Sequence, residues 1–138
     1  MGNHSHAYPG LQSYSFMREV GCQVNNETDT YCYVEAAKST HPSDLYLYQL
    51  PLGLALPNTT VPSCTPCVQS VMSAYAKDGM ASSKLRTTYG PAANIVNTAC
   101  GNEFVATMND IDGNGAVASR VSWGLASVLG GVALLLLW

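Results

Sequence analysis

Two stretches of the chain carry apolar residues at the spacing of an amphipathic α-helix. In residues 65–78, Thr65 is suited to cap the amino end, Pro66 to occupy the first turn and Gly79 to follow the last turn. The apolar positions of this stretch are Cys67, Val68, Val71, Met72 and Tyr75. We therefore predict a helix over residues 65–78.

The second stretch covers residues 83–100 and is closed by Gly101. Its apolar positions form one continuous stripe at helical spacing: Leu85, Tyr89, Ala92, Val96 and Ala99. Pro91 lies inside this stripe and has no backbone N–H, so a kink or break is expected at Gly90 and Pro91. A shorter third helix is predicted over residues 31–38.

The first half of the chain has less regular patterning. Residues 1–21 form a polar, aromatic lead-in without a clear period, and a polar, turn-like segment follows Cys22. Residues 41–63 are apolar but are interrupted by Pro42, Pro51, Pro57 and Pro62. Because proline cannot donate to a β-ladder, we expect an extended, proline-rich loop packed against the helices. The predicted fold is mainly α, a small helical domain over residues 22–105 whose thin core is stapled by disulfides.

The carboxyl end is a continuous apolar run without a charged side chain, residues 121–138. As a helix it would span about 27 Å, just short of a hydrocarbon core of ~30 Å. A cleavable glycolipid-anchor signal joins small residues at the attachment point, a polar spacer and an apolar tail, and residues 114–138 follow this order. Asn114 is the expected attachment residue and Gly113 the second choice. A retained membrane helix and a buried helix are the alternatives.

Residues 106–120 are expected to be a flexible linker that carries this attachment site. Residues 110–115 match the first half of a calcium-binding loop, but the twelfth position is Val121 where the loop needs glutamate. We therefore interpret them as linker and not as a metal site.

A glycolipid anchor requires passage through the secretory route, and the sequence has some features of a secreted protein but not all of them. Three N-glycosylation sequons begin at Asn3, Asn26 and Asn58. Residues 1–16 lack the basic start and apolar run of a signal peptide, and the number of cysteines is odd. We therefore expect the chain to be part of a longer secreted protein.

Composition narrows the function classes. The chain has a net charge of −3 and only 11% charged residues, so it lacks the basic surface of a nucleic-acid binder. At 47% hydrophobic residues, disorder driven by charge is excluded. Cysteine is frequent for 138 residues, which indicates disulfides and an oxidising compartment. The candidate disulfide residues are Cys22, Cys32, Cys64, Cys67 and Cys100.

Cys64 and Cys67 form a C-x-x-C motif at a helix start, where the helix dipole lowers the pKa of a thiol. Thiol oxidoreductases use this arrangement, but the buried strand that precedes it in a thioredoxin fold is missing here. We predict structural disulfides, either between these two cysteines or to others. A redox pair and a zinc site built from Cys64, Cys67, Cys100 and His41 remain the alternatives.

Other polar and aromatic residues give weaker indications. His4, His6 and His41 match no serine-hydrolase motif, so we predict no catalytic residue, metal or cofactor. The tyrosines are candidates for a carbohydrate-stacking surface, although core packing is favoured; they are Tyr31, Tyr33, Tyr46, Tyr48, Tyr75 and Tyr89. In an extended loop, Tyr46 and Tyr48 would lie on one side of the chain.

A set of motifs resembles a known family. They are Tyr31 with Cys32, the loop of residues 42–57, the P-x-C-x-x-C of residues 62–67 and the N-x-x-C-G-x-x-F-V of residues 97–105. Over residues 14–105 the chain is similar to the carboxyl half of an ascomycete fungal family of predicted glycolipid-anchored surface proteins, a domain of unknown function. The resemblance implies a secreted protein with a further upstream segment and gives no catalytic residue.

The sequence therefore predicts a GPI-anchored fungal cell-surface or cell-wall glycoprotein that is not an enzyme and acts as a structural or binding module. Its expected location is the outer face of the plasma membrane or the cell wall. Its expected partners are the membrane, through the lipid anchor or a helix, and cell-wall glycans. A secretory thiol oxidoreductase using the C-x-x-C and a tail-anchored membrane protein are the alternatives.

Overall fold

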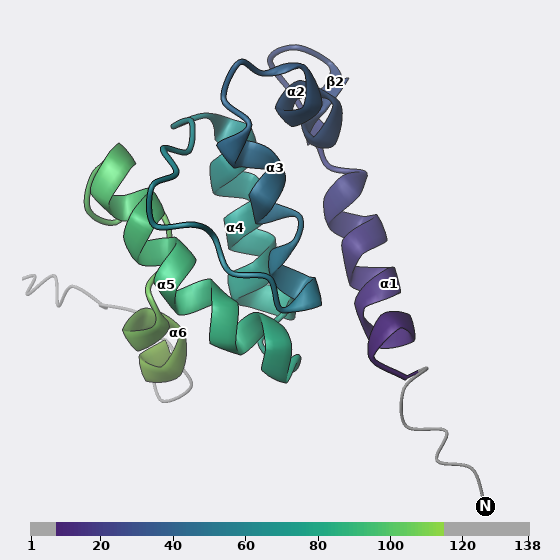
Figure 1. Ribbon diagram of the computed structural model, residues 1–138, viewed down its shortest axis with the longest axis vertical. Coiled ribbons are helices and arrows are strands. Elements are labelled where there is room, and N and C mark those ends of the chain that lie inside the picture. The colour runs from purple at the N-terminus through teal and green to yellow at the C-terminus, as the bar shows by residue number, and fades with distance from the viewer. Residues whose placement is uncertain (1–7, 115–138) are drawn as a thin grey trace, which may run out of the picture.

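The computed structural model describes residues 8–114, and every structural statement below concerns this part of the chain. Figure 1 shows a mainly helical molecule with α1 along one side and α6 beside α5 on the other. In chain order the elements are α1 (Tyr8–Gly21), β1 (Val24–Asn25), β2 (Thr30–Tyr31), α2 (Cys32–Lys38), α3 (Ser43–Leu47), the 3-10 helix η2 (Leu50–Leu52), α4 (Pro66–Asp78), α5 (Ser83–Cys100) and α6 (Met108–Asn114). The expectation of a mainly α fold is confirmed.

The hydrophobic core lies around α4 and α5. The predicted apolar face of α4 is correct at every position, because all five of its apolar residues are buried. On α5, the residues from Leu85 to Val96 in the predicted stripe are buried, but Ala99 is exposed. The last turn of α5 is held by hydrogen bonds and a disulfide instead of by burial of Ala99. The Asn97 amide donates to the Val105 carbonyl at 3.0 Å and accepts from its N–H at 2.9 Å, and Cys100 is in a disulfide.

The helix ends follow the predicted capping residues. Thr65 caps α4 by accepting the N–H of Val68, and the N–H of Gly79 bonds the Tyr75 carbonyl. Of the expected kink or break, the break does not occur, because helix α5 continues across Pro91. Pro91 is exposed, and water can therefore bond the carbonyl group that its missing N–H leaves unpaired.

The expectation of an irregular lead-in is wrong for residues 8–21. Residues 8–21 form helix α1 instead of an irregular lead-in, and Phe16 packs against Tyr75 with ring centroids 5.3 Å apart. The packed unit therefore begins before residue 22. The predicted turn after Cys22 is present at residues 26–29, where it joins the strands of a short antiparallel hairpin in which Val24 pairs with Tyr31. Helix α2 follows directly, as predicted.

The proline-rich segment is also not fully extended, because α3 and η2 form within it. Pro42 precedes the first residue of α3 and Pro51 lies in the first turn of η2, positions that suit the fixed φ of proline. Tertiary hydrogen bonds hold both elements on the core. The Tyr75 hydroxyl donates to the Leu47 carbonyl at 3.1 Å, and the Thr88 hydroxyl donates to the Leu50 carbonyl at 2.9 Å.

Residues 108–114, expected to belong to a flexible linker, form helix α6. Thr107 and Asp110 cap its amino end, since the Thr107 N–H and hydroxyl both donate to the Asp110 carboxylate. Met108 and Ile111 pack against the core. Within residues 8–114, no helix has the length and apolar character needed to cross a membrane. The apolar tail of residues 121–138 lies outside the described residues.

Gly79 is a position where the core leaves no room for a side chain. A Cβ atom there would lie 2.2 Å from Leu85 Cδ2 and 2.9 Å from both Phe16 Cζ and the Tyr75 carbonyl oxygen. We expect Gly79→Ala to lower the free energy of unfolding by about 1–3 kcal/mol, because the backbone carbonyl cannot move aside. Gly21→Ala is the matched control, since nothing lies within 4 Å of its Cβ. Urea unfolding of both variants checks this, and an unchanged midpoint for Gly79→Ala would contradict it.

Candidate functional site

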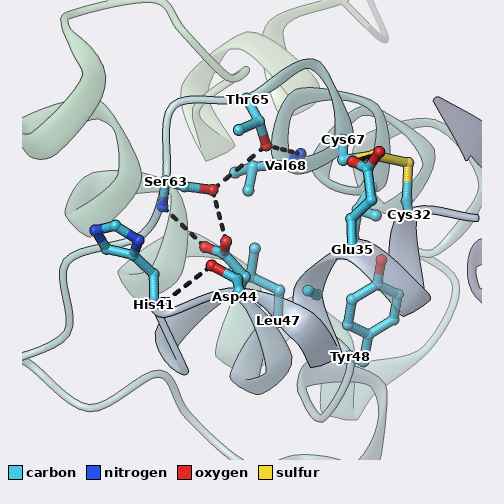
Figure 2. A pocket seen from close by; sticks show the side chains of 13 residues that line it. Cys32, Glu35, His41, Asp44, Leu47, Tyr48, Ser63, Thr65, Cys67 and Val68 are labelled. Atoms are coloured by element: carbon cyan, nitrogen blue, oxygen red, sulfur yellow. Dashed lines mark hydrogen bonds between the residues drawn. A yellow bond between two sulfur atoms is a disulfide. The ribbon is translucent and has the colours of Figure 1, made fainter. Parts of the chain in front are cut away.

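A pocket of about 310 Å³ opens between α2, α3 and the amino-terminal half of α4. Figure 2 shows its polar side chains around an interior to which Leu47 and Val68 contribute. Most of its wall is apolar, and Ala36 and Val71 extend this surface. The pocket therefore combines an apolar interior with polar groups from several elements.

One wall of the pocket is the disulfide between Cys32 on α2 and Cys67 on α4, with Cα atoms 5.3 Å apart. A second disulfide joins Cys64, just before α4, to Cys100 at the end of α5. The prediction that the C-x-x-C cysteines make structural disulfides agrees with this pairing, and each of them bonds a more distant cysteine. Cys22, the fifth candidate, is a free and exposed thiol.

This pairing does not support the two alternatives for the motif. A redox C-x-x-C requires a bond between Cys64 and Cys67, and each is bonded elsewhere. Zinc needs thiolate ligands, but Cys64, Cys67 and Cys100 are all oxidised.

Asp44 on α3 connects the pocket to the segment before α4. Its side chain is buried, and its carboxylate accepts the Ser63 N–H at 2.8 Å and the Ser63 hydroxyl at 2.6 Å. His41 also lines the pocket, but it is exposed and its Nδ1 atom lies 3.5 Å from the Thr40 hydroxyl. Ser63 thus bonds the carboxylate directly, with no histidine between them, so these three residues do not form a hydrolase triad.

Glu35 on α2 lines the pocket on a different side from Asp44 (Figure 2). Its carboxylate accepts the Asn25 amide at 3.0 and 3.2 Å and the Thr28 hydroxyl. The hydrogen bonds from Asn25 and then Thr28 lower the pKa of Glu35 below its ordinary value. The Cys67 sulfur lies 3.3 Å from the same carboxylate, which is a contact only, because a disulfide sulfur carries no proton.

Tyr48, at the carboxyl end of α3, lines the pocket beside Glu35. Its ring meets Tyr33 edge-on with centroids 5.0 Å apart. Figure 2 shows its hydroxyl directed toward Glu35 and the disulfide. Burial, and then the charge of Asp44, raises the pKa of Tyr48. Within residues 8–114 this hydroxyl has no hydrogen-bond partner.

The six candidate tyrosines do not form one stacking surface. Tyr75 and Tyr89 are fully buried in the core. Burial, followed by the charge of Asp110, raises the pKa of Tyr89 to about 12, and its hydroxyl donates to the Ala106 carbonyl. Tyr46 and Tyr48 do not share a side as they would in an extended loop, because α3 places residues two positions apart on different sides of a helix. Tyr31, Tyr33 and Tyr46 are exposed.

The other candidate residues lie away from the pocket. Asn26 and Asn58 are exposed, as glycan acceptors must be, and Asn3, His4 and His6 lie outside the described residues. Gly113 is exposed near the end of α6, and Asn114 is its last residue. The Asp112 carboxylate accepts a hydrogen bond from the Arg86 guanidinium at 2.6 Å. No metal-binding cluster of three or more His, Cys, Asp or Glu side chains occurs between residues 8 and 114.

The polar groups that define the pocket could not be predicted from the sequence. Ser63 and Asp44 are 19 residues apart, and nothing in their spacing indicates a contact. Asn25 and Glu35 are 10 residues apart on the hairpin and on α2, and they meet only because the hairpin folds back.

The model of one family, a domain of unknown function named DUF7729, matches residues 3–109. The chain belongs to the DUF7729 family. Its matched region contains the whole pocket and all four bonded cysteines. No curated protein and no solved structure gives a significant match. The function of this DUF7729 chain must therefore be argued from its own residues.

The Glu35 carboxylate predicts a pH-dependent contribution to stability. Because its pKa is lowered in the fold, this contribution is complete at neutral pH and is lost as the pH falls below about 4.5, the ordinary value, and through the lowered pKa. Glu35→Gln should reduce the free energy of unfolding at pH 7 by about 1 kcal/mol, a modest figure for a partly exposed carboxylate. The difference from the wild-type protein should disappear in acid.

Urea unfolding across the pH range measures this difference. Glu27→Gln is the matched control, because the Glu27 carboxylate has no partner in the described part of the chain. A Glu35→Gln deficit that persisted unchanged in acid would rule out the ionised carboxylate as its source.

Proposed function

We propose that this DUF7729 chain is the ectodomain of a fungal surface glycoprotein, attached through a glycolipid at Asn114 and acting as a binding or structural module. Its place would be the outer face of the plasma membrane or the cell wall. The observation that carries the proposal is the pairing of Cys32 with Cys67 and of Cys64 with Cys100. Small domains with such cross-links are typical of oxidising compartments.

The positions of the modification sites support the same proposal. Asn26 lies in the exposed turn of the hairpin and Asn58 in the exposed turn after η2, so an oligosaccharide at either site would extend into solvent. Gly113 is exposed next to Asn114, and the apolar run of residues 121–138 follows in the sequence. This order of small residues, spacer and tail is the one that the anchoring reaction recognises.

The pocket favours binding over catalysis. Ser63 and Asp44 bond each other, while Glu35 is held by Asn25 and Thr28. In a hydrolase triad a histidine accepts the proton of the nucleophile, and no histidine lies between Ser63 and Asp44. Fixed carboxylates around an apolar interior are better suited to orienting a ligand.

The anchor can be tested on fungal cells that display the full gene product. Treatment with phosphatidylinositol-specific phospholipase C should release a glycosylated protein that lacks residues 115–138, including the apolar tail. The double variant Gly113→Trp/Asn114→Trp is the control, since bulky residues at the attachment point should block lipid transfer.

Release of the wild-type protein but not of this variant is the expected result. Retention of the wild-type protein, with the tail still detected by mass spectrometry, would contradict the proposal and would assign residues 121–138 to a membrane helix.

A further inference from the structure

We propose that the pocket between α2, α3 and α4 binds an organic ammonium ion with an apolar body. This inference rests on the proposed role as a binding module and names the class of ligand. It does not depend on how the chain is attached to a membrane. Three features of the pocket support the inference independently. They are the negative charge of its carboxylates, its apolar interior and the hydroxyl group of Tyr48.

The charges around the pocket select a cation. Glu35 and Asp44 contribute carboxylates from two different helices, and none of the described residues that line the pocket is lysine or arginine. The hydrogen bonds from Asn25 and Thr28 hold Glu35 in place, and those from Ser63 hold Asp44. Each carboxylate oxygen can accept more than one hydrogen bond, so both carboxylates can still accept a proton donor from a ligand. An anionic ligand would meet two carboxylates and no lysine or arginine in the described lining.

The interior selects an apolar body. Ala36, Leu47, Val68 and Val71 form a surface without hydrogen-bonding side chains, and the disulfide of Cys32 and Cys67 continues it. A ligand body rich in hydroxyl groups would leave those groups unpaired against this surface, whereas a hydrocarbon body would displace water from it. The site therefore differs from the stacking surface expected for a neutral sugar.

Tyr48 supplies a group that the fold itself does not use. Its hydroxyl lines the pocket without a hydrogen-bond partner between residues 8 and 114, while its ring is fixed against Tyr33. The phenol oxygen can accept an ammonium N–H, and the ring face can attract the same cation. A ligand that combines a cation with an apolar body would use all of these features together.

Three probes of nearly equal shape separate charge from apolar burial: benzylammonium, benzyl alcohol and benzoate. Each is titrated into the full ¹⁵N-labelled chain, with its disulfides formed, in lipid nanodiscs while backbone amide shifts are recorded. Benzylammonium should move the amides of Ala36, Leu47 and Val68 with a dissociation constant on the order of 1 mM, typical of so small a ligand. Benzyl alcohol should bind about fivefold more weakly, and benzoate about tenfold or more.

Variants locate the binding groups. Tyr48→Phe should weaken benzylammonium binding about threefold without changing stability, because it removes a hydroxyl that has no partner in the fold. Asp44→Asn should weaken binding about five- to tenfold, and its amide oxygen can still accept the Ser63 N–H. Tyr46→Phe is the matched control. Tyr46 is exposed on the same helix and does not line the pocket, so affinity should be unchanged.

Three results would overturn the inference. One is benzoate binding as tightly as benzylammonium, and another is the absence of shifts at the pocket amides with any of the probes. The third is tighter binding of glucosamine, a cation with a polar body, which would reject the apolar body. These results leave phospholipase release untouched, so failure of this inference and failure of the proposed anchor can be told apart.

Discussion

Both disulfides converge on the amino end of α4, and the arrangement of the other helices depends on this point. Cys67 lies in the first turn of α4 and binds α2, while Cys64 lies just before that turn and binds the end of α5. The bonded cysteines are 35 and 36 residues apart, and closing loops of this length stabilises a fold by about 3–4 kcal/mol in the chain-entropy account. Helix α2 buries only Cys32 and Ala36, so the covalent bond replaces apolar packing that this helix lacks.

The same cross-link creates the pocket. Because Cys32 and Cys67 hold α2 against α4, Glu35 and Ala36 face a space whose far side is made by α3 and the segment before α4. Asp44 completes this side by fixing Ser63, which places the start of α4 relative to α3. The stability of the fold and the shape of the pocket therefore depend on the same covalent and polar contacts. Carboxylates that would be mobile on an isolated helix have fixed directions here.

Elements that depend on local contacts could be predicted from the sequence, whereas elements that depend on long-range contacts could not. Helices α4 and α5 could be predicted because Thr65, Pro66 and Gly79 act within one turn and the apolar spacing lies within the helix itself. Helix α3 and η2 could not, because they depend on hydrogen bonds from Tyr75 and Thr88, which are distant in sequence. Four of the five candidate cysteines are in disulfides and Cys22 is free, and the sequence motifs did not give the partners, since spacing does not determine connectivity. The polar side of the pocket was missed for the same reason.

Disulfide mapping shows whether both disulfides meet at the amino end of α4. The full chain, made in an oxidising host, is alkylated without reduction, treated with a glycosidase, digested with trypsin and analysed by mass spectrometry. We expect one cross-linked species that joins the peptides holding Cys32, Cys64 with Cys67, and Cys100, with alkylation at Cys22. Fragmentation should assign Cys32 to Cys67 and Cys64 to Cys100. A separate peptide with an internal bond between Cys64 and Cys67 would rule out this pairing and would favour the thiol oxidoreductase.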